Sequence, residues 1–140
     1  MTPYQHKVQY YETDKMGITH HANYIHWMEE ARVDLLEQMG WGYDRMEALG
    51  IQSPVMEVAC SYRASTTFGD TVEIRADIRG YRGVHLVMGY EVYRLGDGKL
   101  VLSGTSRHCF LDREGKFLRL SREFPELDQA LQAVMKKQEE

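Results

Sequence analysis

The sequence predicts an α+β fold in which an antiparallel sheet wraps around one long central helix. Residues 53–120 read almost entirely as strands separated by turns, whereas residues 22–39 show the spacing of a single amphipathic helix. An antiparallel sheet with one apolar face needs a second layer to cover that face. Eighteen helical residues span roughly 27 Å and a nine-residue strand spans roughly 30 Å, so the helix is long enough to lie along the sheet.

The chain is expected to open with a short strand at residues 6–11, followed by a loop that pivots at Gly17. The long helix then covers residues 22–39 and ends at Gly40, a residue type that favours helix termini. A second, short helix is expected at residues 43–49. The residues of the long helix that recur at helical spacing on one face are Ile25, Met28, Ala31, Leu35, Leu36 and Met39.

Alternating apolar residues mark the strands that follow. In TVEIRADI, residues 71–78, the apolar side chains share one face and the charged side chains share the other. Two longer strands, within residues 83–94 and 99–111, are joined by LGDG, which is a typical hairpin turn. A tail helix is expected to start near Pro125. The segment VMEVACSYRA alternates like TVEIRADI, and its side chains expected on one side are Met56, Val58, Cys60, Tyr62 and Ala64.

The composition is that of one globular domain spanning residues 1–140. With 43% hydrophobic and 27% charged residues, the chain has enough apolar side chains for a sizeable core. No apolar run approaches the roughly 20 residues of a membrane span, and the first residues lack the apolar region of a signal peptide. The net charge of −4 argues against a general nucleic-acid binder. Cys60 and Cys109 lack metal-site spacing and fit reduced thiols, so we expect a cytoplasmic protein.

The densest polar motif precedes the long helix, in YYETDKMGITHHANY at residues 10–24. Here Asp14 is followed by Gly17 three residues later and by His21 seven residues later. A helix containing EEAR comes next, and then the block SYRASTTFGDTVEI at residues 61–74. Together these motifs resemble the hotdog-fold acyl-CoA thioesterases of the 4-hydroxybenzoyl-CoA thioesterase family. The resemblance covers nearly the whole chain up to about residue 120 and is greatest for the subgroup associated with the Tol-Pal system.

This resemblance implies roles for four residues. Asp14 matches the catalytic aspartate, which acts as nucleophile or general base, and Tyr10 matches a tyrosine beside that carboxylate. His21 matches the subgroup's histidine, and its backbone N–H matches the donor that polarises the thioester carbonyl. Gly17 lets the loop turn back so that Asp14 and the helix start face one point. The chemistry agrees, because thioester hydrolysis needs a nucleophile or activated water, and helix starts offer unpaired N–H groups to an oxyanion.

Each of these residues also has an ordinary structural interpretation. A loop aspartate ahead of a helix is commonly a cap or a surface charge, while His21 and Tyr10 can be a solvated helix-start residue and a strand aromatic. The histidines of this region do not complete a metal-site spacing, so we expect no metal and no other cofactor. Glu29 and Glu30 are interpreted as helix-surface or dimer-surface residues, not as a second catalytic carboxylate.

Arginine is concentrated in the second half of the chain. Guanidinium groups suit phosphates, and coenzyme A carries several phosphates. Arg63, on the polar face of its strand, is therefore a candidate for binding substrate, and Arg82 and Arg107 are weaker candidates. The alternative is that each arginine is a solvated sheet residue paired across strands with acids such as Glu73 or Glu91.

The leading hypothesis is hydrolysis of an acyl-CoA to a free acid and CoA. A hotdog dehydratase or hydratase fits less well, because the usual histidine followed by a Phe-Pro-rich segment is missing. A non-catalytic module that binds acyl-CoA or an acyl carrier protein is the alternative, and an acyl carrier protein stays open as a partner. Unpaired sheet edges predict a homodimer or homotetramer. The sequence does not indicate which acyl chain is preferred.

Overall fold

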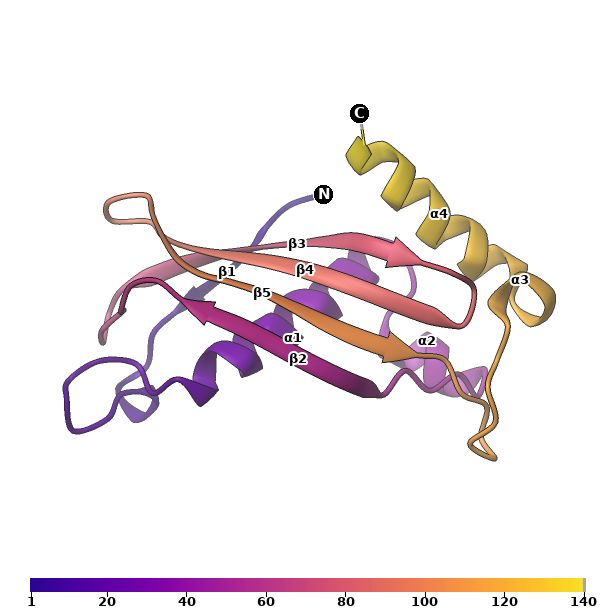
Figure 1. Cartoon of the computed structure of the whole chain (residues 1–140), viewed down its shortest axis with the longest axis horizontal. Coiled ribbons are helices and arrows are strands. Elements are labelled where there is room, and N and C mark those ends of the chain that lie inside the picture. The colour runs from indigo at the N-terminus through magenta and orange to yellow at the C-terminus, as the bar shows by residue number, and fades with distance from the viewer. Residues whose placement is uncertain (140) are drawn as a thin grey trace.

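The computed structural model describes residues 1–139 and contains one five-stranded sheet in the order β1-β3-β4-β5-β2 (Figure 1). All four pairs of neighbouring strands are antiparallel. The long helix α1 (Ala22–Gln38) lies across one face of this sheet, as Figure 1 shows, which confirms the predicted α+β architecture. The strands are β1 (Tyr4–Lys7), β2 (Val55–Tyr62), β3 (Thr71–Tyr81), β4 (His85–Arg94) and β5 (Lys99–Cys109).

Four shorter or later helical elements complete the chain: η1 (Tyr10–Glu12), α2 (Tyr43–Ala48), α3 (Leu120–Glu123) and α4 (Pro125–Glu139). The predicted strand at residues 6–11 is wrong in its second half. Strand β1 ends at Lys7, opposite Thr71 at the start of β3. Beyond it, Val8 bonds to the turn that precedes β3, donating to the Asp70 carbonyl at 2.8 Å and accepting from the Gly69 N–H at 3.1 Å. The chain then turns into the single 3-10 turn of η1. None of the helices among the described residues combines the length and the hydrophobicity that crossing a bilayer requires.

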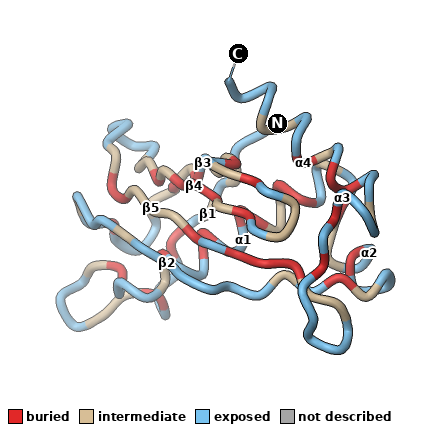
Figure 2. Tube along the Cα trace, turned by 45° about the vertical axis from the view of Figure 1, so that its right-hand side comes forward, coloured by how far each residue is buried: buried red, intermediate tan, exposed pale blue. Residues whose placement is uncertain are grey.

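The core lies between α1 and the central strands β3, β4 and β5, and it appears as red segments in Figure 2. The alternation predicted for residues 71–78 is confirmed, with Val72, Ile74 and Ile78 buried. The prediction for Ile25 is wrong, since this side chain is 37% exposed. The large rings of the adjacent helical positions occupy the interface with the sheet instead. The buried residues of α1 are Tyr24, Trp27, Met28, Ala31, Arg32, Leu35 and Leu36.

The two edges of the sheet differ in what covers them. At one edge, β1 pairs with β3 only as far as Ile74, and α4 covers the remainder. The Gln138 side chain bonds to both the N–H (3.0 Å) and the C=O (2.8 Å) of Ile78, as a strand would. Tyr81 donates its hydroxyl hydrogen to Asp128 of the same helix. The predicted tail helix is therefore confirmed and seals this edge.

The other edge, β2, is largely uncovered. The apolar side predicted for this strand is largely not buried, because α1 does not extend beneath the edge of the sheet: Met56 is 57% and Tyr62 is 47% exposed. Cys60 is the most enclosed residue of the strand, and its thiol lies 3.7 Å from the Met28 sulfur. Both cysteines are free, as expected.

Candidate active site

Asp14 lies in a tight loop between η1 and α1. Its backbone N–H donates to the Ile18 carbonyl at 2.9 Å, and the Gly17 N–H donates to the Asp14 carbonyl at 2.9 Å. A bridge between Thr13 and Thr19 closes the loop. Gly17 has φ +78°, a left-handed conformation that glycine adopts without a steric penalty. The chain therefore reverses direction at Gly17, three residues after Asp14.

The Asp14 carboxylate is partly exposed and is held by a single donor. Oδ1 accepts a hydrogen bond from the Met16 N–H at 2.8 Å, and Oδ2 accepts none from residues 1–139. A loop aspartate that only stabilises a turn makes the same bond to Met16. The bond thus fits either role, whereas the free oxygen and its exposure are what a reacting carboxylate requires.

A buried carboxylate, Glu12, stabilises the loop through hydrogen bonds to the residues around it. Glu12 Oε1 accepts hydrogen bonds from the Gln9 N–H (2.8 Å) and from His6 Nε2 (2.7 Å), and Oε2 accepts one from the Trp27 indole (2.7 Å). Burial raises the pKa of Glu12, but the hydrogen bonds from Gln9, His6 and Trp27 outweigh burial and hold this pKa below its usual value. The sequence interpretation gave Glu12 no role. The available signal was Gln9 three residues earlier, which is capping-box spacing.

The start of α1 is joined to this loop and leaves the backbone N–H of His21 free. The Glu12 carbonyl accepts hydrogen bonds from the His20 N–H and from the Asn23 side chain, both at 2.8 Å. The Ala22 N–H donates to His20 Nδ1 at 3.2 Å, and the Asn23 N–H donates to the His20 carbonyl at 3.0 Å. The His21 N–H has no acceptor within residues 1–139. An unpaired N–H at the positive end of a helix is suited to stabilising an oxyanion.

The His21 side chain is exposed and does not cap the helix. Its ring stacks on His20 with 4.2 Å between centroids. Tyr62, at the end of β2, donates its hydroxyl hydrogen to the His21 carbonyl at 2.9 Å. Sequence reasoning missed Tyr62, because only the folded chain places the end of β2 beside the start of α1.

Tyr10 lies on η1 with its side chain 77% exposed. Its ring contacts Phe68 edge-on at 5.8 Å between centroids, and its carbonyl accepts a hydrogen bond from the Thr13 hydroxyl at 2.7 Å. Within the described chain, the Tyr10 hydroxyl makes no hydrogen bond with Asp14. A role for Tyr10 beside the carboxylate therefore stays a prediction.

The three candidate arginines lie apart from one another. Arg63 directly follows β2, is exposed, and lies 3.4 Å from the Ser103 hydroxyl, at the end of the sheet where Tyr62 meets α1. Arg107 is exposed on β5, opposite Glu57 of β2. Arg82 lies at the β3–β4 turn, in a groove beside α4. Of the three, Arg63 is the one next in sequence to Tyr62, which bonds to the start of α1.

Residues 8–135 match the sequence profile of the thioesterase-like superfamily. The chain belongs to this superfamily. It is 37% identical over 131 residues to YneP of Bacillus subtilis, which is provisionally described as an acyl-CoA thioesterase, and the match covers 93% of this chain and 94% of YneP.

One solved structure and a further sequence relative agree with this assignment. The DHNA-CoA thioesterase from Staphylococcus aureus superimposes with a TM-score of 0.91 at 31% identity, covering 96% of this chain and 91% of that one. The acyl-CoA thioester hydrolase YbgC of Escherichia coli is 30% identical over 81 residues, which is 58% of this chain and 60% of YbgC. The hotdog fold expected from the motifs is therefore confirmed. Membership of the Tol-Pal-associated subgroup stays a prediction.

In this thioesterase-like chain, the loop before α1 and the start of the helix carry two groups of the kinds that thioester hydrolysis requires. One is a carboxylate with a free oxygen, Asp14. The other is the unpaired His21 N–H. The hydrogen bonds of Glu12 and the left-handed conformation of Gly17 hold the loop that contains Asp14 against the start of α1.

Proposed function

We propose that this protein hydrolyses acyl-CoA thioesters to a free carboxylic acid and CoA. The observation that carries the proposal is Asp14, with a free carboxylate oxygen, on a loop anchored by Glu12 at the start of α1, where the His21 N–H is unpaired. Relatives described as acyl-CoA thioesterases support the same reaction.

Asp14 has two chemically complete routes. As a general base, it takes a proton from water while the water oxygen attacks the thioester carbonyl carbon. As a nucleophile, it attacks that carbon itself, and water then hydrolyses the resulting mixed anhydride. In both routes the carbonyl oxygen gains negative charge near the His21 N–H. The C–S bond then breaks, and CoA leaves as a thiolate that takes up a proton.

The substrate class that we propose is broad. One structural neighbour at 31% identity acts on DHNA-CoA, an aromatic acyl thioester. We therefore expect aryl-CoA thioesters to belong in the substrate range alongside aliphatic ones. Arg63 follows Tyr62, which bonds to the start of α1, and it is the residue we propose to contact the CoA phosphates.

The decisive experiment is an assay of thiol release on short-chain, long-chain and aryl-CoA thioesters with the wild-type protein and Asp14→Asn. The substitution keeps the size of the side chain and removes its basicity, so turnover should fall by about 10²- to 10⁴-fold. The melting temperature should not change, because Asp14 is partly exposed and makes one side-chain hydrogen bond. Full turnover in a folded Asp14→Asn protein would refute the assignment and leave a binding module as the alternative.

We further propose that the protein assembles through the open edge of β2. Val55, Met56, Val58 and Tyr62 are exposed there, between 36% and 57%, and an uncovered strand edge with apolar side chains favours pairing with a second copy. Light scattering should give at least a dimer at micromolar concentration. Val58→Lys should dissociate it, whereas Lys at the exposed Leu95 of the β4–β5 turn should not. An active wild-type monomer would contradict this.

A further inference from the structure

A second group of polar side chains lies in the core, farther along α1, and the proposed reaction does not use it. Arg32 of α1 is 3% exposed and His108 of β5 is 1% exposed. His108 Nε2 lies 2.6 Å from the Ser106 hydroxyl, which lies 2.7 Å from the Tyr90 hydroxyl. Arg32 Nη2 donates to the Tyr43 hydroxyl oxygen. We refer to these five residues as the Arg32 cluster.

Arg32 is a buried positive charge without a counter-charge. Its Nη1 atom has no hydrogen-bond partner among the described residues. Every ion pair formed within 4.0 Å by residues 1–139 uses other side chains. Buried charges are normally paired, because removing an ion from water costs several kcal/mol. Something that this single chain does not supply is therefore expected to neutralise the guanidinium.

The other members of the cluster carry no charge at neutral pH. Burial, and then the positive charge of Arg32, lower the pKa of His108 to about 4, and the backbone of Pro54 and Ser53 opposes this only in part. Burial raises the pKa of Tyr90 to about 12. The cluster thus has a net charge of one, all of it on Arg32.

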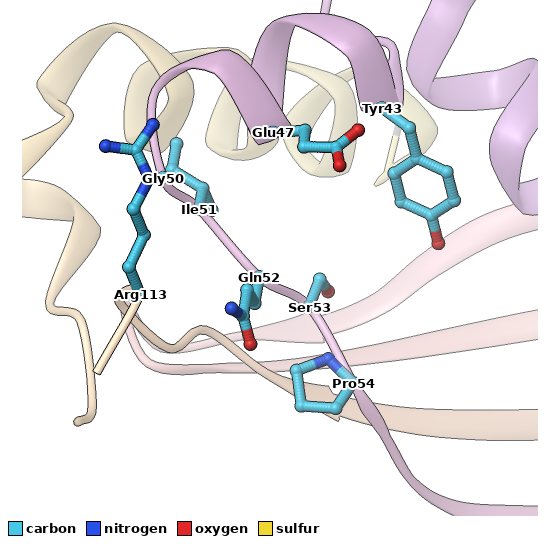
Figure 3. Close-up of a pocket in the computed structure, with 8 residues that line it drawn as sticks. All are labelled: Tyr43, Glu47, Gly50, Ile51, Gln52, Ser53, Pro54 and Arg113. Carbon is cyan, nitrogen blue, oxygen red and sulfur yellow. The ribbon is translucent and has the colours of Figure 1, made fainter. Parts of the chain in front are cut away.

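A cavity of about 620 Å³ adjoins the cluster (Figure 3). Tyr43, which binds Arg32, forms one wall, and Ser53 and Pro54, whose backbone faces His108, lie across from it. Ile51 adds apolar surface. The volume is typical of small-molecule sites, which combine apolar walls with a few polar groups.

We propose that this cavity binds a small organic anion, namely an anionic oxygen carried on an apolar body such as an aromatic ring. The Tyr43 hydroxyl is the direct donor, because its oxygen accepts a hydrogen bond from Arg32 and its own hydrogen is left to donate. A hydroxyl that accepts from a charged donor is itself a stronger donor. Arg32 behind it supplies the charge that selects an anion over a neutral molecule. Two charged residues of opposite sign, Glu47 and Arg113, also line the cavity, but both are exposed and screened by water.

Within one chain this site is separate from the Asp14 loop. Arg32 follows His21 by eleven residues, which places it roughly 16 Å farther along α1. The proposal therefore does not require hydrolysis, and binding is measurable in the Asp14→Asn protein. If the protein does not hydrolyse acyl-CoA, the proposed anion site is unaffected. If no anion binds, the proposed hydrolysis is unaffected.

The test is calorimetric titration of the full-length protein with 2-naphthoate and with 2-naphthamide, which has the same ring system without the charge. We expect the acid to bind at least tenfold more tightly than the amide. Tyr43→Phe removes the donor and should weaken binding of the acid by about tenfold or more, as for a hydrogen bond to a charged group. Arg45→Met is the matched control: Arg45 is an exposed arginine stacked on Trp41, and its loss should leave binding unchanged.

Arg32→Met separates a ligand site from a purely structural arginine. It replaces an unpaired buried charge with an apolar side chain, so the unliganded protein should melt at a higher temperature, while the rise caused by naphthoate should disappear. Equal affinity for acid and amide, or unchanged naphthoate binding in Tyr43→Phe, would overturn the proposal even if Arg32→Met did not fold. A third outcome would also overturn the proposal: the wild-type protein does not bind naphthoate, and the Arg32→Met protein no longer forms the oligomer. In that case a second copy of the chain neutralises Arg32.

Discussion

At the start of α1 the polar groups of the Asp14 loop face water, whereas two to three turns later the Arg32 cluster is enclosed by the sheet. The first end is organised mainly by backbone hydrogen bonds and by one buried anchor, Glu12, so Asp14 and the His21 N–H are left accessible. At the second end, Arg32 and His108 are almost completely buried. From this difference we expect that substitutions in the Asp14 loop alter activity and leave stability unchanged. Substitutions in the Arg32 cluster should alter stability and leave activity unchanged.

After the loss expected for Asp14→Asn, the largest effect is expected from removing the His21 N–H. His21 has φ −56°, which proline adopts readily, so His21→Pro deletes the donor without forcing the helix start out of shape. Loss of one oxyanion donor should lower kcat by about 10²- to 10³-fold. His21→Ala removes the ring but keeps the N–H, and the ratio of the two variants measures the backbone contribution.

Both His21 variants should melt within a few degrees of the wild type, since the ring is exposed and the N–H is unpaired. Equal kcat values for His21→Pro and His21→Ala would show that the backbone donor is not used. A marked loss of stability in His21→Pro alone would erase the contrast between the two ends of the helix.

The second-largest expected effect is a pH dependence of stability caused by the buried His108. Its pKa is about 4 in the folded protein against 6.5 for an ordinary histidine, so the unfolded chain binds the extra proton between these values. The contribution of neutral His108 to the free energy of unfolding is therefore fully present above pH 6.5 and is lost as the pH falls toward 4. The difference corresponds to about 3 kcal/mol. Urea unfolding at pH 7.5, 6 and 5 should show the free energy of unfolding decreasing in this order.

His108→Gln should flatten that pH dependence above pH 5, and Asp14→Asn should leave it as in the wild type. Glu12 acts at lower pH, because its lowered pKa contributes stability that is lost only as the pH falls through and below its usual value of 4.5. A wild-type protein equally stable at pH 5 and 7.5 would contradict the burial of a neutral His108.

The smallest expected effect is the rise in KM caused by removing the candidate phosphate-binding arginines. An exposed contact with a nucleotide phosphate is worth about 1 kcal/mol or less, so Arg63→Ala should raise KM for acyl-CoA a few-fold with kcat unchanged. A pantetheine thioester, which lacks the nucleotide, should be affected less, and added salt should shrink the difference. Arg107→Ala tests the second candidate in the same way.

Arg82→Ala is the comparison within the same chain, because Arg82 lies at the β3–β4 turn beside α4. Identical losses with both thioesters in Arg63→Ala and Arg107→Ala would return these residues to the role of solvated sheet charges. A larger effect of Arg82 than of Arg63 would move the nucleotide site to the groove beside α4.

Local periodicity was sufficient to predict most of the fold. The alternation of Val72, Ile74 and Ile78 predicted a half-buried strand, because side chains of a strand point to opposite faces wherever it lies. Helical spacing predicted α1 to within one residue, and Gly17 marked the turn after Asp14, because a left-handed φ favours glycine in any context. The motif around Asp14 was likewise readable, since all of its parts are close in sequence.

Only the tertiary structure decided which predicted faces are buried and which distant groups meet. The alternation in β2 resembles that in β3, yet Met56 is exposed, because burial depends on whether α1 extends beneath the strand and not on the strand's own sequence. The hydrogen bond from Tyr62 to His21 and the contact of Cys60 with Met28 join residues that are 41 and 32 positions apart. Such pairs leave no periodic trace, because the packing of helix on sheet, not the spacing along the chain, brings them together.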